Sequence, residues 1–486
     1  MANEMKTRTA SSRPDGRGTW KHTVLGTALA MLVASSSVVA GPLRVQNGRF
    51  VDQAGGDVVL RGFNLSQWHK IPPFRPNQDP ALFAKLSQMG VNAVRLQFNW
   101  EAYETAPGVY DETYLDYYAG VVARARAQNV YVIVDIHQDL FSRWTLSGCG
   151  EGFPQWAIPA GTPVVATPDN GSACSTWPVT AMFRRGEMDT LFNNFMAPGN
   201  MAREHYLIVL EKLARRFVGT SNVIGYEPLN EPFGSGPALV QLNRDAAARV
   251  RAIDPSAIVF VCPEMWSGLG IAANTALTNP NLQNLVFAPH YYDVLISFKM
   301  WAGQRYEPRA QSNRDLAKTW GAAVVLGEFG GPPSAVMPTY MDMIYNDLEK
   351  FGESGLQWGY TPEWNPVTFD GFNSENLSVI DDQGLPRNNF TPRPYVRRTA
   401  AGSYGQWQKS AGGWFRGPQI SYSWNHEPIR GATELFVPTG YFGGQAVPNI
   451  VVTPSGVACA LQGDGQLLRC TAPMAGKVTV TVSAAD

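Results

Sequence analysis

The stretch Tyr131-Val-Ile-Val-Asp-Ile136 is a short apolar run with one charged residue, typical of a strand that is buried on both faces of a parallel sheet. A helical pattern, Glu112 to Gln128, comes directly before it. Seven similar runs complete a set of eight predicted strands. The eight are Val58 to Phe63, Ala93 to Phe98, Tyr131 to Ile136, Val223 to Leu229, Ile258 to Cys262, Leu285 to Ala288, Ala323 to Leu326 and Gly355 to Trp358.

Longer stretches with helical periodicity lie between these runs. They include Pro80 to Met89, Glu112 to Gln128, Arg203 to Phe217, Pro237 to Ile253 and Pro338 to Gly352. Eight strand–helix repeats in roughly 320 residues predict an α/β fold of the (β/α)₈ TIM-barrel type. An open doubly wound sheet is the alternative. It would bind its ligand at a glycine-rich turn after the first strand, and no G-x-G-x-x-G pattern follows that strand.

The residue pattern changes beyond about Gly402. There Gly and Pro separate short runs in which apolar and polar residues alternate, such as Lys477-Val-Thr-Val-Thr-Val482. This pattern is typical of short strands in a β-sandwich. We therefore expect the barrel to occupy residues 41–402 and a small C-terminal β-sandwich to occupy residues 403–486. Within the barrel, a long insert between Asp139 and Met201 has few periodic features, and it should lie on the face where barrel loops build active sites.

The N-terminal segment resembles a signal peptide. Several basic residues precede the apolar run Val24 to Ala34, and small residues lead from there to Ala40. The alternative is a retained membrane anchor, but this run is short for a bilayer span. We therefore expect residues 1–40 to be removed and the protein to be secreted or periplasmic.

Five cysteines agree with export, because their spacing suggests local disulfides. Cys149 and Cys174 bracket a loop rich in Gly, Pro, Ser and Thr, and Cys459 and Cys470 flank a Gly-Asp-Gly turn. Cys262 ends an apolar run and is expected to be a free core thiol. No Cys-x-x-Cys or His-x-x-x-His spacing occurs, so we expect neither a metal nor another cofactor.

Charged residues make up only 16% of the chain and its formal net charge is -1. Such a composition is typical of a compact globular protein without a large basic patch, so we expect no nucleic-acid partner. We also expect a monomer.

Polar side chains follow the predicted strands, at the ends where barrel enzymes carry their catalytic residues. They are Arg95 and Asn99 at the second strand, His137-Gln-Asp139 at the third, Asn230-Glu-Pro232 at the fourth, His290-Tyr-Tyr292 at the sixth, Glu328 at the seventh and Trp358 at the eighth.

Two of these residues, Glu231 and Glu328, suit glycoside hydrolysis, which needs one protonated and one ionised carboxyl beside the anomeric carbon. We expect Glu231 to be the catalytic acid/base and Glu328 the nucleophile. A retaining mechanism places the two carboxyls roughly 5 to 5.5 Å apart. Arg95 would keep Glu328 ionised, while His290 and Tyr292 orient the pair.

Each of these residues also has an ordinary structural interpretation. A lone glutamate at a strand end is more often solvated or ion-paired than catalytic. His137 alone could serve a core hydrogen bond, and a tryptophan such as Trp358 packs more often than it binds sugar. Their joint occurrence at successive strand ends favours the catalytic interpretation.

Two motifs, Leu229-Asn-Glu-Pro232 and Leu326-Gly-Glu-Phe-Gly330, resemble the acid/base and nucleophile motifs of glycoside hydrolase family 5. Within that family the chain is most similar to endoglycoceramidases and related glycolipid hydrolases. The motifs that carry this likeness are Leu60-Arg-Gly-Phe-Asn64, Asp135-Ile-His-Gln-Asp139, Asn230-Glu-Pro-Phe233 and Pro289-His-Tyr-Tyr292. The chain differs from these enzymes at Gly359 to Trp364 and in the insert around Cys149 to Cys174. The resemblance therefore does not identify which glycolipid is cleaved.

The resemblance implies that Lys70 and Asp139 bind hydroxyls of the first sugar. It also implies that Trp177 corresponds to a tryptophan in the equivalent insert of those glycolipid hydrolases. The expected substrate-binding residues are Lys70, Arg95, His137, Asp139, Trp177, Asn230, His290, Tyr292 and Trp358. Apolar residues beyond the cleaved bond would form a channel for the lipid. They are Phe233, Leu295, Ile296 and Phe298.

Sequence and resemblance together predict a retaining β-glycoside hydrolase that cleaves a sugar, either one glucose or an oligosaccharide, from ceramide or a similar lipid. Transient contact with a membrane or micelle surface would accompany this substrate. The alternative activity is a polysaccharide endo-β-glycanase of the cellulase or mannanase type. The non-enzymatic alternative is a carbohydrate-binding surface protein, which would have no need of a paired acid and nucleophile.

Overall fold

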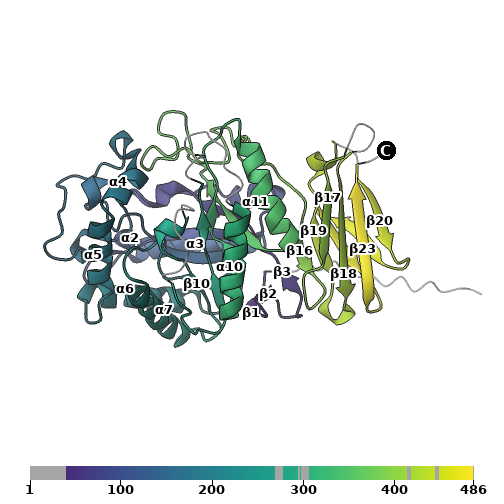
Figure 1. Cartoon of the computed structure of the whole chain (residues 1–486), viewed down its shortest axis with the longest axis horizontal. Helices are drawn as coiled ribbons and strands as arrows, with labels where there is room; N and C mark the ends of the chain where they lie inside the picture. The colour runs from purple at the N-terminus through teal and green to yellow at the C-terminus, as the bar shows by residue number, and fades with distance from the viewer. Residues whose placement is uncertain are drawn as a thin grey trace, which may run out of the picture. The chain divides into compact units, whose positions relative to one another are not determined.

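Figure 1 shows the computed structural model of the chain. The structure describes residues 40–268, 277–293, 296, 306–412, 417–443 and 448–484. Within these ranges no helix has the length and apolar character needed to cross a membrane. The predicted signal peptide lies outside them apart from Ala40 and stays a prediction.

Eight parallel strands close into a barrel, as predicted, each strand pairing with the next around the ring. In chain order they are β4 (Arg61–Leu65), β5 (Ala93–Asn99), β8 (Tyr131–His137), β9 (Val223–Glu227), β10 (Ile258–Val261), β11 (Leu285–Phe287), β13 (Ala323–Leu326) and β15 (Ser354–Tyr360). The first predicted strand was placed too early. Val58 belongs to β3 (Asp57–Val58) of another sheet, and the barrel strand begins at Arg61.

The five predicted helices are confirmed, with ends that shift by a few residues. The main helices of the barrel are α1 (Leu82–Gln88), α3 (Glu112–Ala127), α6 (Met201–Phe217), α7 (Gly236–Arg251), α10 (Tyr306–Trp320) and α11 (Met337–Phe351), and α6 and α7 lie side by side (Figure 1). In α11 the buried residues Tyr340, Ile344 and Leu348 recur every fourth position and form one face. That helix ends at Phe351 and is capped by Gly352, whose φ of 61° suits glycine.

The insert after β8 is more helical than predicted. It contains α4 (Trp177–Phe183) and α5 (Arg185–Met196), besides short 3₁₀ turns. In α5 the side chains of Phe192 and Phe195 pack edge-on against Phe141, with ring centroids 5.3 and 5.8 Å away. Phe153 of the insert also stacks on Tyr206 of α6, with ring centroids 5.4 Å apart, and this contact joins the insert to the main hydrophobic core.

Shorter elements complete the barrel. They are α2 (Trp100–Tyr103), β6 (Glu104–Ala106), β7 (Val109–Tyr110), α8 (Met265–Gly268), β12 (His290–Tyr291) and β14 (Glu328–Phe329).

The remaining strands form two antiparallel sheets, which agrees with the predicted small β-sandwich. One contains β1 (Arg44–Gln46), β2 (Arg49–Val51), β3, β16 (Tyr395–Thr399), β19 (Thr433–Phe436), β22 (Leu467–Thr471) and β21 (Ala458–Gln462). The other contains β17 (Gln406–Ser410), β18 (Gln419–His426), β23 (Gly476–Ser483) and β20 (Asn449–Thr453).

A single apolar cluster lies between these sheets, with Leu435 and Leu468 from one and Tyr422 and Val480 from the other, all buried. The first sheet draws β1, β2, β3 and β16 from upstream of residue 402. The domain boundary at that residue stays a prediction.

Both predicted disulfides are present. Cys149 bonds to Cys174, and Cys459 bonds to Cys470 across the hairpin of β21 and β22. Cys262 is free and buried, directly after β10.

Candidate active site

The two predicted catalytic glutamates lie together at the carboxyl ends of the barrel strands. β12 and β14 continue beyond β11 and β13 and pair with each other, so His290 stands opposite Glu328 in register. Nδ1 of His290 lies 2.9 Å from Oε1 of Glu231 and 3.5 Å from Oε2 of Glu328. A carboxylate oxygen of Glu231 and one of Glu328 lie within 4.8 Å of each other. This close approach agrees with the carboxyl spacing of retaining glycosidases, about 5 to 5.5 Å.

Arg95 lies beneath Glu328 and is completely buried. Its guanidinium donates to Oε1 of Glu328 at 2.7 Å and to both oxygens of Glu227 at 2.6 and 3.1 Å. It also contacts Asn64 at 2.9 Å, Asn230 at 2.7 Å and Asp135 at 3.0 Å. We call these residues the Arg95 network: Arg95, Asn64, Asp135, Glu227, Asn230 and Glu328.

The Arg95 network and His290 set the charge of Glu328. Burial alone would raise the pKa of this carboxyl, but the positive charges of His290 and Arg95 outweigh it and lower the pKa to about 2. The hydroxyl of Tyr292 donates to the second oxygen, Oε2, at 2.9 Å. Glu328 is therefore ionised and oriented, as a nucleophile must be.

Glu231 has the opposite electrostatic environment. Burial raises its pKa, and the negative charge of Glu328 acts in the same direction, against the effect of His290. Its backbone has a φ of 33°, which costs a non-glycine residue on the order of 1–3 kcal/mol. The side-chain amide of Gln138 donates to the carbonyl oxygens of Asn230 at 2.6 Å and Glu231 at 3.1 Å, and so holds this turn.

His137 and Trp358 form one wall of the site. Their rings stack with centroids 5.3 Å apart and an interplanar angle of 18°. Nδ1 of His137 lies 2.6 Å from Asp135, while burial and then the charge of Lys70 lower the pKa of the imidazole well below its usual value. His137 is therefore neutral, and its position is fixed by the Arg95 network through Asp135.

Lys70 is the centre of a second buried cluster. Its ammonium group lies 2.5 Å from Asp139 and faces the rings of Trp358 and Phe372, at 4.3 and 4.6 Å from their centroids. Glu375 and Glu151 raise the pKa of Lys70 together with Asp139, although burial opposes them. We call these residues the Lys70 group: Lys70, Asp139, Glu151, Trp177, Trp358, Phe372 and Glu375.

Trp177 joins the Lys70 group through Glu375, because its indole N–H donates to that carboxyl at 2.8 Å. Burial raises the pKa of Glu375 to about 7 and that of Glu151 above its usual value, so both carboxyls hold protons readily. The predicted residues Lys70, Asp139 and Trp177 therefore meet in one place.

Several site residues were not predicted to have a role. Asn64, Asp135 and Gln138 stand inside the quoted motifs, whereas Glu151, Glu227, Phe372 and Glu375 were missed. The sequence did indicate a role for Glu227, because a charged residue inside an apolar, buried strand needs a partner of opposite charge or a hydrogen bond. Asn99, which was expected at the second strand end, donates to Glu151 at 2.9 Å and caps α2.

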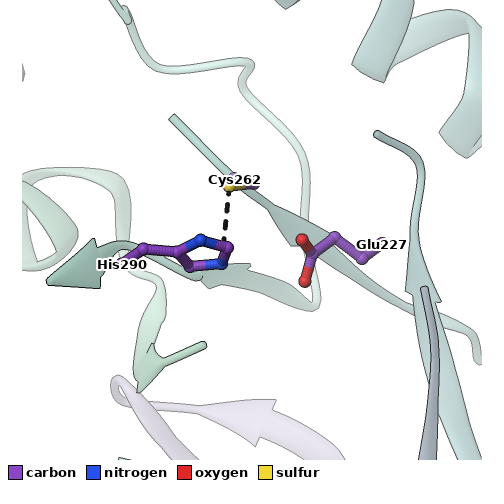
Figure 2. Close-up of side chains that lie close together, drawn as sticks. All are labelled: Glu227, Cys262 and His290. Carbon is purple, nitrogen blue, oxygen red and sulfur yellow. Dashed lines mark hydrogen bonds between the residues drawn. The ribbon is translucent and has the colours of Figure 1, made fainter. Parts of the chain in front are cut away.

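Three groups in the described part of the chain bring possible metal-ligating atoms within 4.8 Å of one another. They are Glu227, Cys262 and His290 (Figure 2), then His137, Asp139 and Glu151, and finally Glu231, His290 and Glu328. Each group contains a carboxylate that is already paired, with Arg95 or with Lys70. These pairs supply the positive charge that a cation would bring, and we assign no metal role to the groups.

A family model described as cellulase (glycosyl hydrolase family 5) matches residues 51–361, which is more than half of the chain. The chain belongs to glycosyl hydrolase family 5. This membership confirms the resemblance drawn from the motifs around Glu231 and Glu328.

Relatives in this family include endoglycoceramidase I of Rhodococcus hoagii, 27% identical over 349 residues that cover 65% of this chain and 67% of that protein. An ergosteryl-beta-glucosidase of Saccharomyces cerevisiae is 34% identical over 143 residues, 23% of this chain and 18% of that protein. The chain therefore spans about two thirds of the first relative and less than a fifth of the second.

Among solved structures, endo-glycoceramidase II from Rhodococcus sp. in complex with a five-membered iminocyclitol is similar, with a TM-score of 0.72 and 24% identity. The match covers 90% of this chain and 99% of that one. This likeness confirms the fold across both the barrel and the C-terminal sheets.

Proposed function

We propose that the protein is a retaining β-glycoside hydrolase that cleaves the bond between a sugar and a lipid. The observation that carries the chemistry is the carboxyl pair. Glu231 and Glu328 lie within 4.8 Å, with the pKa of one raised and that of the other lowered to about 2. Two carboxyls with opposite pKa shifts take the roles of acid and nucleophile.

The first half-reaction uses both glutamates. Ionised Glu328 attacks the anomeric carbon and forms a covalent bond to it, while Glu231 gives its proton to the glycosidic oxygen, which keeps the electron pair of the broken bond. In the second, Glu231 takes a proton from water as the water oxygen attacks the same carbon, and Glu328 leaves as a carboxylate. Arg95 and Tyr292 hold Glu328 in place throughout.

The Lys70 group supports binding of the first sugar. Lys70 has three ammonium donors and Asp139 accepts from hydroxyls, so the two side chains suit neighbouring hydroxyls of one ring. Trp358 offers an apolar face that is already positioned by His137.

The names of the relatives support a lipid aglycone, because they include endoglycoceramidases, glucosylceramidases and a steryl glucosidase. The predicted apolar channel has less support. Phe233 and Ile296 are each 2% exposed and belong to the main core, and Phe233 packs against Trp266. Leu295 and Phe298 lie outside the described residues.

Helix α4 supports contact with a membrane or micelle surface. Val179, Met182 and Phe183 recur at helical spacing and are 45%, 44% and 84% exposed. Trp177 at the start of the same helix belongs to the Lys70 group. Phe183→Ser should lower turnover of glycolipid in vesicles severalfold and spare a soluble aryl glycoside. Ile429→Ser, at an equally exposed residue of the C-terminal region, is the matched control.

We also propose export, with residues 1–40 removed, and a monomeric enzyme. Two disulfides support an oxidising destination. N-terminal sequencing of the mature protein and its mass in solution test these two points.

The experiment that tests the mechanism uses azide with an activated aryl β-glycoside. Glu231→Ala should be rescued and should give a β-azide, because azide attacks the covalent intermediate that Glu328 still forms. Glu328→Ala should give no β-azide. An α-azide from Glu231→Ala would contradict the mechanism, since it would mean that no covalent intermediate forms.

The substrate is tested separately on a panel of glucosylceramide, lactosylceramide, a ganglioside, a steryl glucoside and soluble cellulose. Cleavage of at least one glycolipid is expected. Efficient cleavage of cellulose with every glycolipid left intact would overturn the lipid assignment and leave the two-glutamate mechanism standing.

A further inference from the structure

The disulfide of the insert lies beside two members of the Lys70 group. Cys149 stands two residues before Glu151, and Cys174 stands three residues before Trp177. Both cysteines are buried. Their bond, which we call the insert disulfide, therefore joins the segment that carries Glu151 to the segment that carries Trp177.

The segment that carries Glu151 packs closely against Asp139. The backbones of Glu151 and Asp139 form an antiparallel bridge, with N–H to oxygen pairs at 2.7 and 3.3 Å. A Cβ added at Gly150 would lie only 2.8 Å from the carbonyl oxygen of Asp139, so the close approach requires glycine. The residues that follow the insert disulfide therefore hold the backbone of Asp139, the ion-pair partner of Lys70.

A buried asparagine, Asn373, connects the loop after β15 to the insert disulfide. Its side-chain amide donates to the carbonyl oxygen of Cys149 at 2.8 Å, and its backbone N–H donates to the carbonyl oxygen of Asn170 at 2.9 Å. Asn373 is 1% exposed and stands between Phe372 and Glu375, which both belong to the Lys70 group. These two bonds therefore link the loop after β15 to the backbone at the insert disulfide.

The insert and the loop after β15 are joined at a second place. The indole N–H of Trp177 donates to Glu375 at 2.8 Å. Within the insert, the side-chain amide of Asn170 donates to the carbonyl oxygen of Gly150 at 2.9 Å. Three segments that are distant in sequence, residues 149–151, 170–177 and 372–375, are therefore held together by one covalent bond and four hydrogen bonds.

We propose that Cys149, Cys174 and Asn373 are positioning residues, which hold the Lys70 group in the arrangement that binds the first sugar. The inference rests on the proposed function, which assigns the first sugar to this group. Segments that are already ordered before the sugar arrives lose less conformational entropy on binding, and this preorganisation raises affinity. Without the insert disulfide, part of this ordering would have to accompany binding.

The catalytic carboxyls do not depend on these three segments. Glu328 is held by Arg95 and Tyr292, and Glu231 is held by His290 and by the turn that Gln138 supports. Loss of the insert disulfide should therefore affect binding of the sugar more than the chemical step.

The test compares the two disulfides of the chain. One double variant carries Cys149→Ala with Cys174→Ala. The matched control carries Cys459→Ala with Cys470→Ala, which removes the bond across the hairpin of β21 and β22 in the C-terminal sheets. For each variant, KM and kcat are measured on dinitrophenyl β-glucoside and β-lactoside, and Tm is measured by calorimetry.

Loss of the insert disulfide should raise KM about tenfold and change kcat by less than about threefold. The control should lower Tm but leave KM and kcat close to wild type, because its bond is distant from the Lys70 group. An unchanged KM in the insert variant, an equal rise in both variants, or a fall in kcat as large as the rise in KM would overturn the inference.

A single substitution tests the same inference with the insert disulfide intact. Asn373→Gly removes the side-chain amide, and glycine suits the φ of 50° at this position. KM should rise about threefold, because the loop after β15 loses its bond to Cys149. Asn281→Gly is the matched control, since Asn281 has a φ of 53° and precedes β11, at the opposite end of the barrel from the site.

The variant Asn373→Gly decides the question if the double variant does not fold. A KM equal to that of wild type, or the same rise in Asn281→Gly, would contradict the inference. A wild-type enzyme that cleaves neither the glucoside nor the lactoside would instead overturn the proposed function, and the inference with it.

Discussion

The Arg95 network and the Lys70 group are both built around one buried cation, yet they differ in how completely that cation is bonded. Arg95 is held by three carboxylates and two amide oxygens. Lys70 has one close carboxylate, Asp139, and otherwise faces two aromatic rings. The first arrangement is saturated, whereas the second leaves ammonium hydrogens for a ligand.

This difference separates two tasks. The Arg95 network fixes Glu328, the proposed nucleophile, and together with His290 lowers its pKa to about 2, which requires permanent partners. The Lys70 group contains carboxyls, Glu151 and Glu375, whose raised pKa values let them carry protons when charge is not needed. Because these carboxyls can be neutral, the Lys70 group can bind a neutral polar ligand such as a sugar.

The largest effect is expected from Arg95→Met. Loss of the guanidinium leaves Glu227, Asp135 and Glu328 as buried, uncompensated acids, which should lower the free energy of unfolding by about 3–5 kcal/mol. Activity should be lost as well, because the pKa of Glu328 rises. Arg95→Lys, which keeps the charge without the planar fork, should recover part of the stability. Urea denaturation measures both variants.

Lys70→Met should have a smaller effect on stability and a clear effect on catalysis. Methionine keeps the packing between Trp358 and Phe372, and Glu151 and Glu375 can take up protons to offset the lost charge. We expect kcat/KM on glycolipids to fall about tenfold, which corresponds to about 1.4 kcal/mol. If Lys70→Met destabilised the protein as much as Arg95→Met, the proposed difference between the two clusters would be wrong.

The smallest effect is a dependence of stability on pH. Burial raises the pKa values of Glu375 and Asp135 to about 7, so between pH 4 and 7 the folded state binds more protons than the unfolded state. Stability should therefore fall as pH rises through this window, by about 1 kcal/mol or more per group. Glu375→Gln should reduce the difference in Tm between pH 5 and pH 8. An unchanged difference would show that Glu375 does not titrate there.

Much of the fold and of the Arg95 network could be predicted from the sequence. The barrel strands are continuous apolar runs, and parallel strands end at the same mouth of the barrel. The sequence therefore predicts that Arg95, Asn230 and Glu328 lie close together. Helix α5 could also have been predicted, because its apolar residues follow helical spacing. They are Met188, Leu191, Phe192 and Phe195.

The Lys70 group could be predicted only in part. Lys70, Asp139 and Trp177 came from family resemblance, but Phe372 and Glu375 lie in a long loop after β15 that has no periodic pattern. Nothing in the local sequence of such a loop states which distant side chain it will contact. Their place in the site became visible only from the folded chain.

The sheet that combines β1, β2 and β3 with β16, β19, β22 and β21 also has a consequence for biosynthesis. Strand β3 at Asp57–Val58 pairs with β16 at Tyr395–Thr399, so more than 300 residues must be synthesised between the two partners. Contacts of such sequence separation form late, because closing a long loop costs entropy before any pairing repays it. Strands β1, β2 and β3 can pair with one another early, but β3 should lack its other partner, β16, until the barrel between them has been made.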